Sequence, residues 1–409
     1  MSRPRIAFVE SNTSGTGRLF LAAARELGFQ PIMLTSAPER YPFLSAEDCD
    51  VVTLDTGDTA ALVEVSRELS RKGLAGVTSS SEYFVVAAAR VAWQLGLPGP
   101  DPVALASCRD KHLQRQRLRA AGVAIPDFRA AETPEDAVRA AEAFGFPVIV
   151  KPVSGSGSVG VAACSSPEGV HAHAAALLGQ AVNERGQPVP RMVLVETIAQ
   201  GPEYSVETFD RTVVGVTAKH LGSPPYFIEV GHDHPAPLHT VERDALARIT
   251  RAALDALGLG FGPAHTEIRY TESGPAIIEV NPRLAGGFIP ELVRLATGVD
   301  LVRNTVARIA RQPAPCEPLH RRHASLRFLL PPAEGSLARI DGLEAAGRLR
   351  GVAEARMYGA VGSQLACRHD FRDRIGHVIA TGATPEDAMA TADRAREQVR
   401  LTVTPARGA

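Results

Sequence analysis

Two acidic residues and an asparagine lie on two neighbouring predicted strands in the second half of the chain, at Glu267, Glu279 and Asn281. Alternate residues of a strand share a face, so Glu279 and Asn281 point the same way. A turn at residues 271–275 would fold the strands into a hairpin that brings Glu267 against Glu279. Carboxylate and amide oxygens are the ligands that Mg²⁺ prefers, and Mn²⁺ accepts them too. We therefore expect a metal site that would spread the charge developed in phosphoryl transfer.

The residues around Glu279 favour this interpretation over a solvated hairpin whose acidic residues merely face water. Glu279 stands between two isoleucines and Val280 in an apolar run. An unpaired carboxylate would be costly in such a run, which argues for a bound cation. Arg283 follows two residues beyond Asn281 and supplies a planar cation for an oxyanion.

A lysine at the end of another predicted strand precedes a loop rich in glycine and serine. The strand ends at Lys151, and the loop Ser154–Gly160 follows it. Glycines let a backbone approach an anion closely, and such a loop can wrap phosphates with its N–H groups. The loop residues that we expect to bind phosphate are Ser156, Gly157, Ser158 and Gly160. It is not a Walker A loop, because the lysine precedes the glycines. The alternative is a flexible surface loop, against which the strand and its lysine argue.

A third segment combines a predicted buried strand with two carboxylates. The strand that begins at Met192 ends with Glu196, Thr197 and Ile198, and Glu203 follows a turn. This segment could form an edge that reads adenine, with Glu203 as the acid that binds ribose. An ordinary strand–turn–strand would have the same pattern.

Two other patterns are interpreted as structural. The loop Ser11–Gly17 follows a strand and opens a helix, but Phe20 stands where a dinucleotide-binding motif has its third glycine. We therefore do not expect NAD binding. His232, His234 and His239 have irregular spacing and no partner motif, so they indicate a polar loop near the active site and not a metal site.

The elements that would position these residues fall into three blocks. The first, residues 1–105, alternates predicted strands and helices, which is typical of parallel strands with helical crossovers. The second, residues 106–315, has mixed strands and helices with a lid at about 125–205, and the third covers residues 316–409. We expect an α/β fold followed by α+β structure, and a last helix that runs from Pro385 to Leu401 with Thr384 as its cap.

Composition narrows the class of protein. The 409 residues carry 44 basic and 45 acidic side chains, so no global field would attract nucleic acid or a membrane surface. No apolar run is long enough to span a bilayer, and the N-terminus does not resemble a signal peptide. Five scattered cysteines indicate reduced thiols. We expect a cytoplasmic protein that acts on small molecules.

Together these segments resemble the ATP-grasp superfamily, and most closely its carboxylate–amine ligase branch. That branch includes the L-amino acid ligases and is related to biotin carboxylase. The resemblance covers essentially the whole chain, with a Rossmann-like pre-ATP-grasp domain, an ATP-grasp domain with a mobile lid, and a C-terminal α+β domain. It implies ATP as substrate and Mg²⁺ as cofactor. It also implies that Lys111, within Arg109-Asp110-Lys111, is the first nucleotide-binding lysine, and that the protein forms a homodimer.

The resemblance assigns further roles residue by residue. Lys151 would be the second nucleotide-binding lysine, and Glu196 to Ile198 would be the adenine hinge, although Thr197-Ile198 replace its usual acidic and aromatic residues. Glu203 would bind ribose, and Arg283 would hold the transferred phosphate. The residues expected to take part in catalysis are Arg283, Lys151 and Asn281.

Three stretches resemble the amino-acid ligases in particular: residues 224–232, 235–237 and 283–287. Residues 230–234 lack the basic sequence of a biotin carboxylase, which argues against bicarbonate chemistry. The residues expected to bind the substrates are Glu229, His232, Arg283, Gly286 and Gly287. The candidates for a general base are Glu229, His232 and His234.

The resemblance implies an ADP-forming ligase that joins a carboxylate to an amine through an acyl phosphate. The alternatives are an ATP-grasp carboxylase, a ligase with another acceptor, and a nucleotide-binding module without catalysis.

Overall fold

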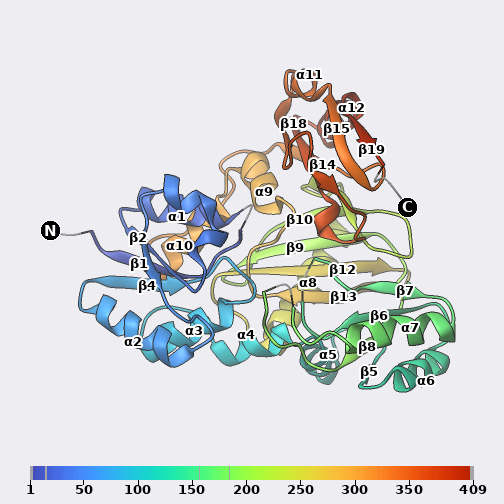
Figure 1. Ribbon diagram of the computed structural model, residues 1–409, viewed down its shortest axis with the longest axis horizontal. Helices are drawn as coiled ribbons and strands as arrows, with labels where there is room; N and C mark the ends of the chain where they lie inside the picture. Colours follow the sequence, from blue (N-terminus) through green and yellow to red (C-terminus); the bar gives the residue numbers. More distant parts are fainter. Residues whose placement is uncertain (1–2, 14–15, 156, 184, 406–409) are drawn as a thin grey trace.

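The computed structural model describes residues 3–13, 16–155, 157–183 and 185–405. Its first block is built on a parallel sheet of order β3-β2-β1-β4 (Figure 1). The strands are β1 (Arg5–Val9), β2 (Gln30–Thr35), β3 (Asp50–Thr53) and β4 (Leu74–Thr78). The crossover helices are α1 (Thr16–Glu26), α2 (Thr59–Ser70) and α3 (Val85–Gln94). The predicted α/β alternation is confirmed.

Alternation along β1 explains why helices cover both faces of this sheet. Ile6 and Phe8 pack on one side with α1 and with α10 (Leu301–Ile309), a helix from far along the chain. Ala7 and Val9 pack on the other side with α2 and α3. Successive side chains of a strand point to opposite faces, so a fully buried strand is apolar throughout.

The lid predicted at about 125–205 contains a separate antiparallel sheet of order β5-β8-β6-β7. Its strands are β5 (Phe128–Ala131), β6 (Val148–Pro152), β7 (Ala162–Cys164) and β8 (Val193–Thr197). Helices α6 (Pro134–Phe144) and α7 (Pro167–Leu178) bury small and aliphatic residues against one face of it. Residues on the other face of this sheet line the cavity described below.

An eight-stranded sheet of order β13-β12-β9-β10-β11-β14-β18-β16 runs through the rest of the molecule (Figure 1). Its first five strands in space are β13 (Gly274–Asn281), β12 (Pro263–Thr271), β9 (Glu203–Phe209), β10 (Thr212–Leu221) and β11 (Glu229–His234). The other three are β14 (His323–Leu329), β18 (Gly376–Gly382) and β16 (Val352–Met357). Helix α8 (Thr240–Leu257) packs its apolar side under β9, β10, β12 and β13. Helices α4 (Pro102–Arg109), α5 (Lys111–Ala120) and α9 (Ile289–Thr297) connect these parts.

The sheet crosses the predicted boundary between the second and third blocks, because β14, β16 and β18 all lie beyond residue 315. The two predicted domain boundaries, after residues 105 and 315, stay predictions. The C-terminal part adds a small sheet of order β17-β15-β19, with β15 at Gly335–Asp341, β17 at Gln364–Leu365 and β19 at Arg400–Thr404. Helix α11 (Leu343–Gly347) and helix α12 (Pro385–Gln398) complete it.

Two sequence expectations about elements were wrong. Helix α12 begins under the predicted Thr384 cap but ends at Gln398, and Leu401 belongs to β19, which pairs with β15. His232 and His234 lie on the buried strand β11 and not in a polar loop. In the described part of the chain, no helix is both long and apolar enough to cross a membrane.

Candidate active site

A cavity opens between the lid sheet and the eight-stranded sheet, and most of the predicted site residues line it. Those from the lid side and α5 are Lys111, Lys151, Gly157, Ser158, Glu196, Thr197 and Ile198. Those from the large sheet and the turn after it are Glu203, Glu229, Glu267, Glu279, Asn281 and Arg283. Residues that stand up to 172 positions apart in the sequence thus face one space.

At one end of the cavity, Lys151 is held by a buried carboxylate. Its Nζ lies 2.6 Å from Glu196 Oε2, and Arg115 Nε lies 2.8 Å from Glu196 Oε1. Burial would raise the pKa of Glu196, but Arg115 and Lys151 outweigh it and lower that pKa to about 2. Burial lowers the pKa of Lys151 to about 8, against the opposing effect of Glu196. The Glu196 side chain therefore orients Lys151, while Thr197 and Ile198 remain at the cavity wall.

Lys111 joins the glycine-rich loop to the predicted metal strand. It is the first residue of α5, whose N-terminus Asp110 caps by accepting hydrogen bonds from two backbone N–H groups. Lys111 Nζ donates to Gly155 O at 2.7 Å and lies 2.9 Å from Glu279 Oε1. Glu279 is thus paired in an otherwise apolar strand, as burial requires.

The predicted hairpin has the expected register, with Glu267 of β12 directly opposite Glu279 of β13. Asn281 ends β13 on the same strand and also lines the cavity. These residues offer two carboxylates and an amide oxygen, and this donor chemistry fits a Mg²⁺ ion. The fit rests on the donor set and on the position of all three side chains at one cavity wall.

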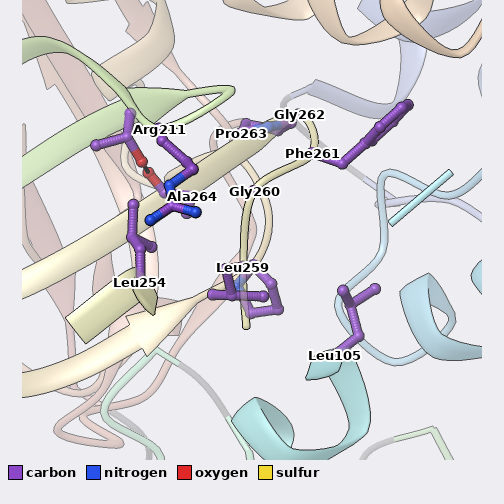
Figure 2. Close-up of a pocket in the computed structure, with 11 residues that line it drawn as sticks. Leu105, Arg211, Leu254, Leu259, Gly260, Phe261, Gly262, Pro263 and Ala264 are labelled. Atoms are coloured by element: carbon purple, nitrogen blue, oxygen red, sulfur yellow. Dashed lines mark hydrogen bonds between the residues drawn. The ribbon is translucent and has the colours of Figure 1, made fainter. Parts of the chain in front are cut away.

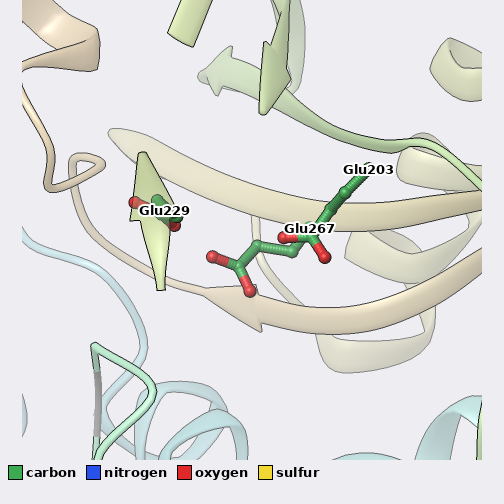
Figure 3. A group of neighbouring side chains, drawn as sticks. All are labelled: Glu203, Glu229 and Glu267. Carbon is green, nitrogen blue, oxygen red and sulfur yellow. The ribbon is translucent and has the colours of Figure 1, made fainter. Parts of the chain in front are cut away.

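The carboxylates of Glu203, Glu229 and Glu267 converge from three strands, and each offers an oxygen within 4.8 Å of the others (Figure 3). The Nζ of Lys219 on β10 lies 2.8 Å from Glu203, 2.7 Å from Glu229 and 2.8 Å from Glu267. Burial would lower the pKa of Lys219, but the three carboxylates raise it well above its usual value. An ammonium group therefore already occupies the space between these three carboxylates, which argues against a metal ion at that place.

Glu267 has a second cationic partner. His265 Nε2 lies 3.2 Å from Glu267 Oε1, and its Nδ1 lies 2.8 Å from Glu207 Oε1. Burial opposes the charged form of His265, but the two carboxylates raise its pKa to about 9. His265 is therefore a protonated histidine that links two acids.

Arg283 reaches the first block of the chain. Its Nε donates to Glu82 Oε2 at 2.8 Å, and its NH2 also pairs with Glu82. Arg109 lies 3.4 Å from the same carboxylate. Burial would raise the pKa of Glu82, but Arg283 and Arg109 lower it. Glu82 was missed in the sequence, although it follows the carboxyl end of β4, where parallel sheets bind ligands.

Glu229 and His232 form a pair at the far side of the Lys219 cluster. His232 Nδ1 donates to Gly287 O at 2.9 Å, and its Nε2 lies 3.2 Å from Glu229 Oε2. Glu229 lines the cavity, whereas His232 is fully buried behind it. His232 thus positions Glu229. His234 is also buried, with Nδ1 2.9 Å from Thr217 Oγ1, and burial lowers its pKa to about 4.

The two glycines predicted to bind substrate, Gly286 and Gly287, do not line the cavity, and Gly287 packs closely in this corner. Gly287 has φ +59°, and a Cβ there would come 2.5 Å from His232 Cε1. In the glycine-rich loop, Gly157 and Ser158 line the cavity, whereas Gly160 packs against Leu177. Ser156 lies outside the described residues.

A hairpin from the lid also reaches the first block, which sequence reasoning did not predict. Val182 and Pro188 pair across it, and Asn183 Oδ1 accepts from Arg185 N and Gln187 N. Arg185 NH2 donates to Ser11 O at 3.3 Å, and its guanidinium lies over the ring of Tyr83. The turn-forming asparagine and glycine were the only signal in the sequence.

A second hollow lies under β12, between Leu105, Arg211 and Leu259 (Figure 2). Its volume of about 10 Å³ has room for one water molecule at most. It cannot hold a nucleotide, so the larger cavity is the candidate site.

Three segments of the chain match known domain families. Residues 21–99 match the ATP-grasp N-terminal domain, residues 144–291 the ATP-grasp domain, and residues 327–404 the L-amino acid ligase C-terminal domain 2.

Individual relatives extend this likeness over the whole chain. An uncharacterized protein of Sinorhizobium fredii, y4rH, is 36% identical over 395 residues, which cover 96% of this chain and 82% of the relative. A D-alanine–D-alanine ligase B of Pseudomonas putida is 25% identical over 318 residues, covering 73% of this chain and 94% of that enzyme. The crystal structure of an L-amino acid ligase from Bacillus licheniformis has a TM-score of 0.82 at 23% identity, and covers 99% of this chain and 100% of that one.

Proposed function

The chain belongs to the ATP-grasp family, and we propose that it is an ATP-dependent ligase that joins a carboxylate to an amine through an acyl phosphate. The observation that carries this proposal is the meeting of two lysines, an arginine and a carboxylate–amide set at one cavity. Relatives named as ligases of amino acids support an amide as the product.

ATP would lie between the lid sheet and the large sheet, with adenine at Thr197 and Ile198. Lys111 and Lys151 would neutralise its phosphates, since both Nζ atoms are fixed by carboxylates at the cavity wall. Gly157 and Ser158 would bring backbone N–H groups to the phosphates. Glu203 would contact the ribose.

Glu267, Glu279 and Asn281 would hold Mg²⁺, which Mn²⁺ could replace. When bound, the ion supplies Lewis-acid stabilisation for phosphate oxygens. Residues of the chain provide two further contributions. Arg283 would stabilise the negative charge of the transferred phosphoryl group, and the lid would keep water from it.

In the first step a carboxylate oxygen of the substrate attacks the γ-phosphorus of ATP, and the bond to the β-phosphate oxygen breaks to release ADP. In the second step the amine attacks the carbonyl carbon of the acyl phosphate. The carbon–nitrogen bond forms, the carbon–oxygen bond to phosphate breaks, and a proton passes from the nitrogen to water. Glu229, an ionised carboxylate at the cavity wall, offers a charge that would bind the amine substrate.

The test is to incubate the protein with ATP, Mg²⁺ and pools of amino acids and small carboxylates, and to measure ADP, phosphate and product masses. A product lighter than a carboxylate–amine pair by one water establishes the ligase and names its substrates. ADP release with a carboxylate alone would instead favour a carboxylase or a different acceptor. Binding of ATP without release from any pool would favour a nucleotide-binding module.

Two further proposals follow from the family. We propose a homodimer, which light scattering coupled to size exclusion would test. We also propose that the protein acts in the cytoplasm, where ATP is supplied and its scattered thiols stay reduced.

A further inference from the structure

One short segment of the C-terminal part reaches the active site at three places. His369 stacks on Tyr226 with ring centroids 4.1 Å apart, and Phe371 N donates to Gly157 O in the glycine-rich loop at 3.3 Å. Arg374 NH2 donates to Glu229 Oε2 at 2.6 Å. The segment 369–374 thus contacts three parts of the site: the loop before β11, the glycine-rich loop, and the Glu229 carboxylate at the cavity wall.

The surroundings of Arg374 fix its guanidinium in one place. Its side chain is only 12% exposed, and its guanidinium carbon lies 4.4 Å from the ring centroid of Phe328 on β14. The edge of the same ring supports His232, with centroids 5.6 Å apart. A Cβ at Gly287 would come 3.4 Å from Arg374 NH1. Phe328 therefore aligns Arg374 and His232 on the same carboxylate.

The bonds of Glu229 show what Arg374 adds. Glu229 Oε1 pairs with Lys219, and Glu229 Oε2 accepts a hydrogen bond from Arg374 and lies 3.2 Å from His232 Nε2. Lys219 is shared among three carboxylates, so it cannot balance Glu229 alone. Without Arg374, Glu229 would turn toward Lys219 and lose the orientation that its present partners impose.

We infer that Arg374, supplied by the C-terminal part of the chain, is a positioning residue for the amine end of the active site. It holds Glu229 against His232, with the carboxylate at the cavity wall where the amine substrate binds. This inference rests on the proposed function, because it assigns a partner to the residue proposed to bind the amine.

The experiment separates acyl-phosphate formation from transfer to the amine. Hydroxylamine is neutral at pH 7.5 and small enough to attack an acyl phosphate without a site for an ammonium group. ATP, Mg²⁺ and an equal mixture of the twenty L-amino acids are supplied, and amide is measured by mass spectrometry. Hydroxamate is measured in parallel after hydroxylamine is added.

Arg374→Gln should lower amide formation at subsaturating amino acids by about ten- to hundredfold, as for a lost charge-assisted hydrogen bond. Hydroxamate formation and the KM for ATP should stay within about threefold of the parent protein, because the phosphate end keeps its own ligands. Arg374→Lys should recover part of the amide rate. Glu229→Gln combined with Arg374→Gln should be no worse than Glu229→Gln alone, since Arg374 acts through Glu229.

The matched control is Arg372→Gln, two residues away. Its guanidinium pairs with Asp370 and is 42% exposed, so the same charge is lost away from Glu229. Both rates should stay within about threefold of the parent. An equal loss of amide and hydroxamate in Arg374→Gln, or a loss as large in Arg372→Gln, would overturn the inference in favour of a structural role. A parent protein that forms neither product would overturn the proposed function itself, and a parent that forms only hydroxamate would overturn the assignment of an amine end.

Discussion

At the scale of single residues, the site consists of charges that neutralise one another until substrates arrive. Glu279 is paired with Lys111, and Arg283 with Glu82. Lone buried charges would cost several kcal/mol each, so the groups proposed to bind metal and phosphate are stabilised by these pairs. If ligands replace one partner of a pair, as the proposed function requires, both members should be sensitive to substitution.

Glu279→Gln should lower turnover by about a hundredfold or more, because it removes a charged ligand of the proposed metal site. Steady-state ADP release at saturating Mg²⁺ measures this. Glu272→Gln is the control, because Glu272 is exposed in the turn of the same hairpin. Near-normal turnover of Glu279→Gln would rule out the metal assignment.

Glu196→Gln should destabilise the fold by about 3–5 kcal/mol, because Arg115 and Lys151 would keep buried charges without their carboxylate. Urea denaturation at pH 7 measures the loss. Glu344→Gln breaks an exposed pair with Arg348 and should cost less than about 1 kcal/mol. Similar losses in both variants would contradict the buried network.

The same residue gives a prediction for acid. The pKa of Glu196 falls from 4.5 to about 2 on folding, so its stabilisation is present above pH 4.5 and is lost as pH falls toward 2. The free energy of unfolding should therefore fall less steeply over that interval in Glu196→Gln than in the parent. Denaturation curves at pH 4.5, 3.5 and 2.5 measure the two slopes, and equal slopes would show that Glu196 does not cause the loss.

The site residues that could be predicted from the sequence are those whose roles depend on local spacing. Glu267, Glu279 and Asn281 could be placed together because strand periodicity and one hairpin relate them. Glu82 and Arg374 were missed, because each acts through a partner that stands 201 or 145 positions away. No local pattern carries such contacts, which arise only when the sheets and loops assemble.

At the scale of elements, the lid contacts two other parts of the molecule, the C-terminal part and the first block. The glycine-rich loop meets Phe371 of the C-terminal part, and the hairpin 181–189 meets the first block through Arg185. Strand and helix positions in the first block followed from periodicity, but this hairpin lacks an apolar pattern and could not be foreseen. The end of α12 was also missed, since its last predicted turn pairs as a strand instead.

Arg185→Ala should loosen the lid and let water reach the acyl phosphate, because one contact between lid and first block is lost. The ratio of phosphate released to amide formed should rise severalfold, while the KM for ATP changes little. Arg191→Ala is the control, because Arg191 is exposed on the same connection. An unchanged ratio in Arg185→Ala would show that the hairpin does not seal the site.

At the scale of the whole molecule, the large sheet makes the C-terminal part inseparable from the catalytic region. Strand β14 pairs with β11, from Gly231 opposite Arg327 to His234 opposite Ala324. Arg327 also pairs with Asp233 across this junction. Leu292 and Ala296 of α9 share a core with β14 and β18. A boundary at residue 315 would therefore divide the sequence at a point where the two sides belong to one folding unit.

Removing residues 316–409 should therefore abolish folding of the remainder. Strand β11, which begins at Glu229, would become an unpaired edge of the sheet, and the apolar side of α9 would be exposed to solvent. Both changes favour aggregation. Calorimetry of the full chain should show that the region around β11 and β14 unfolds in one transition, and the fragment 1–315 should fail to bind ADP. Co-expression of 316–409 as a separate chain is the control, because restored binding would show that the missing strands and not the cut itself are the cause. A soluble fragment 1–315 that binds ADP as tightly as the full chain would mean that the sheet can end at β11, and that the C-terminal part is an independent domain.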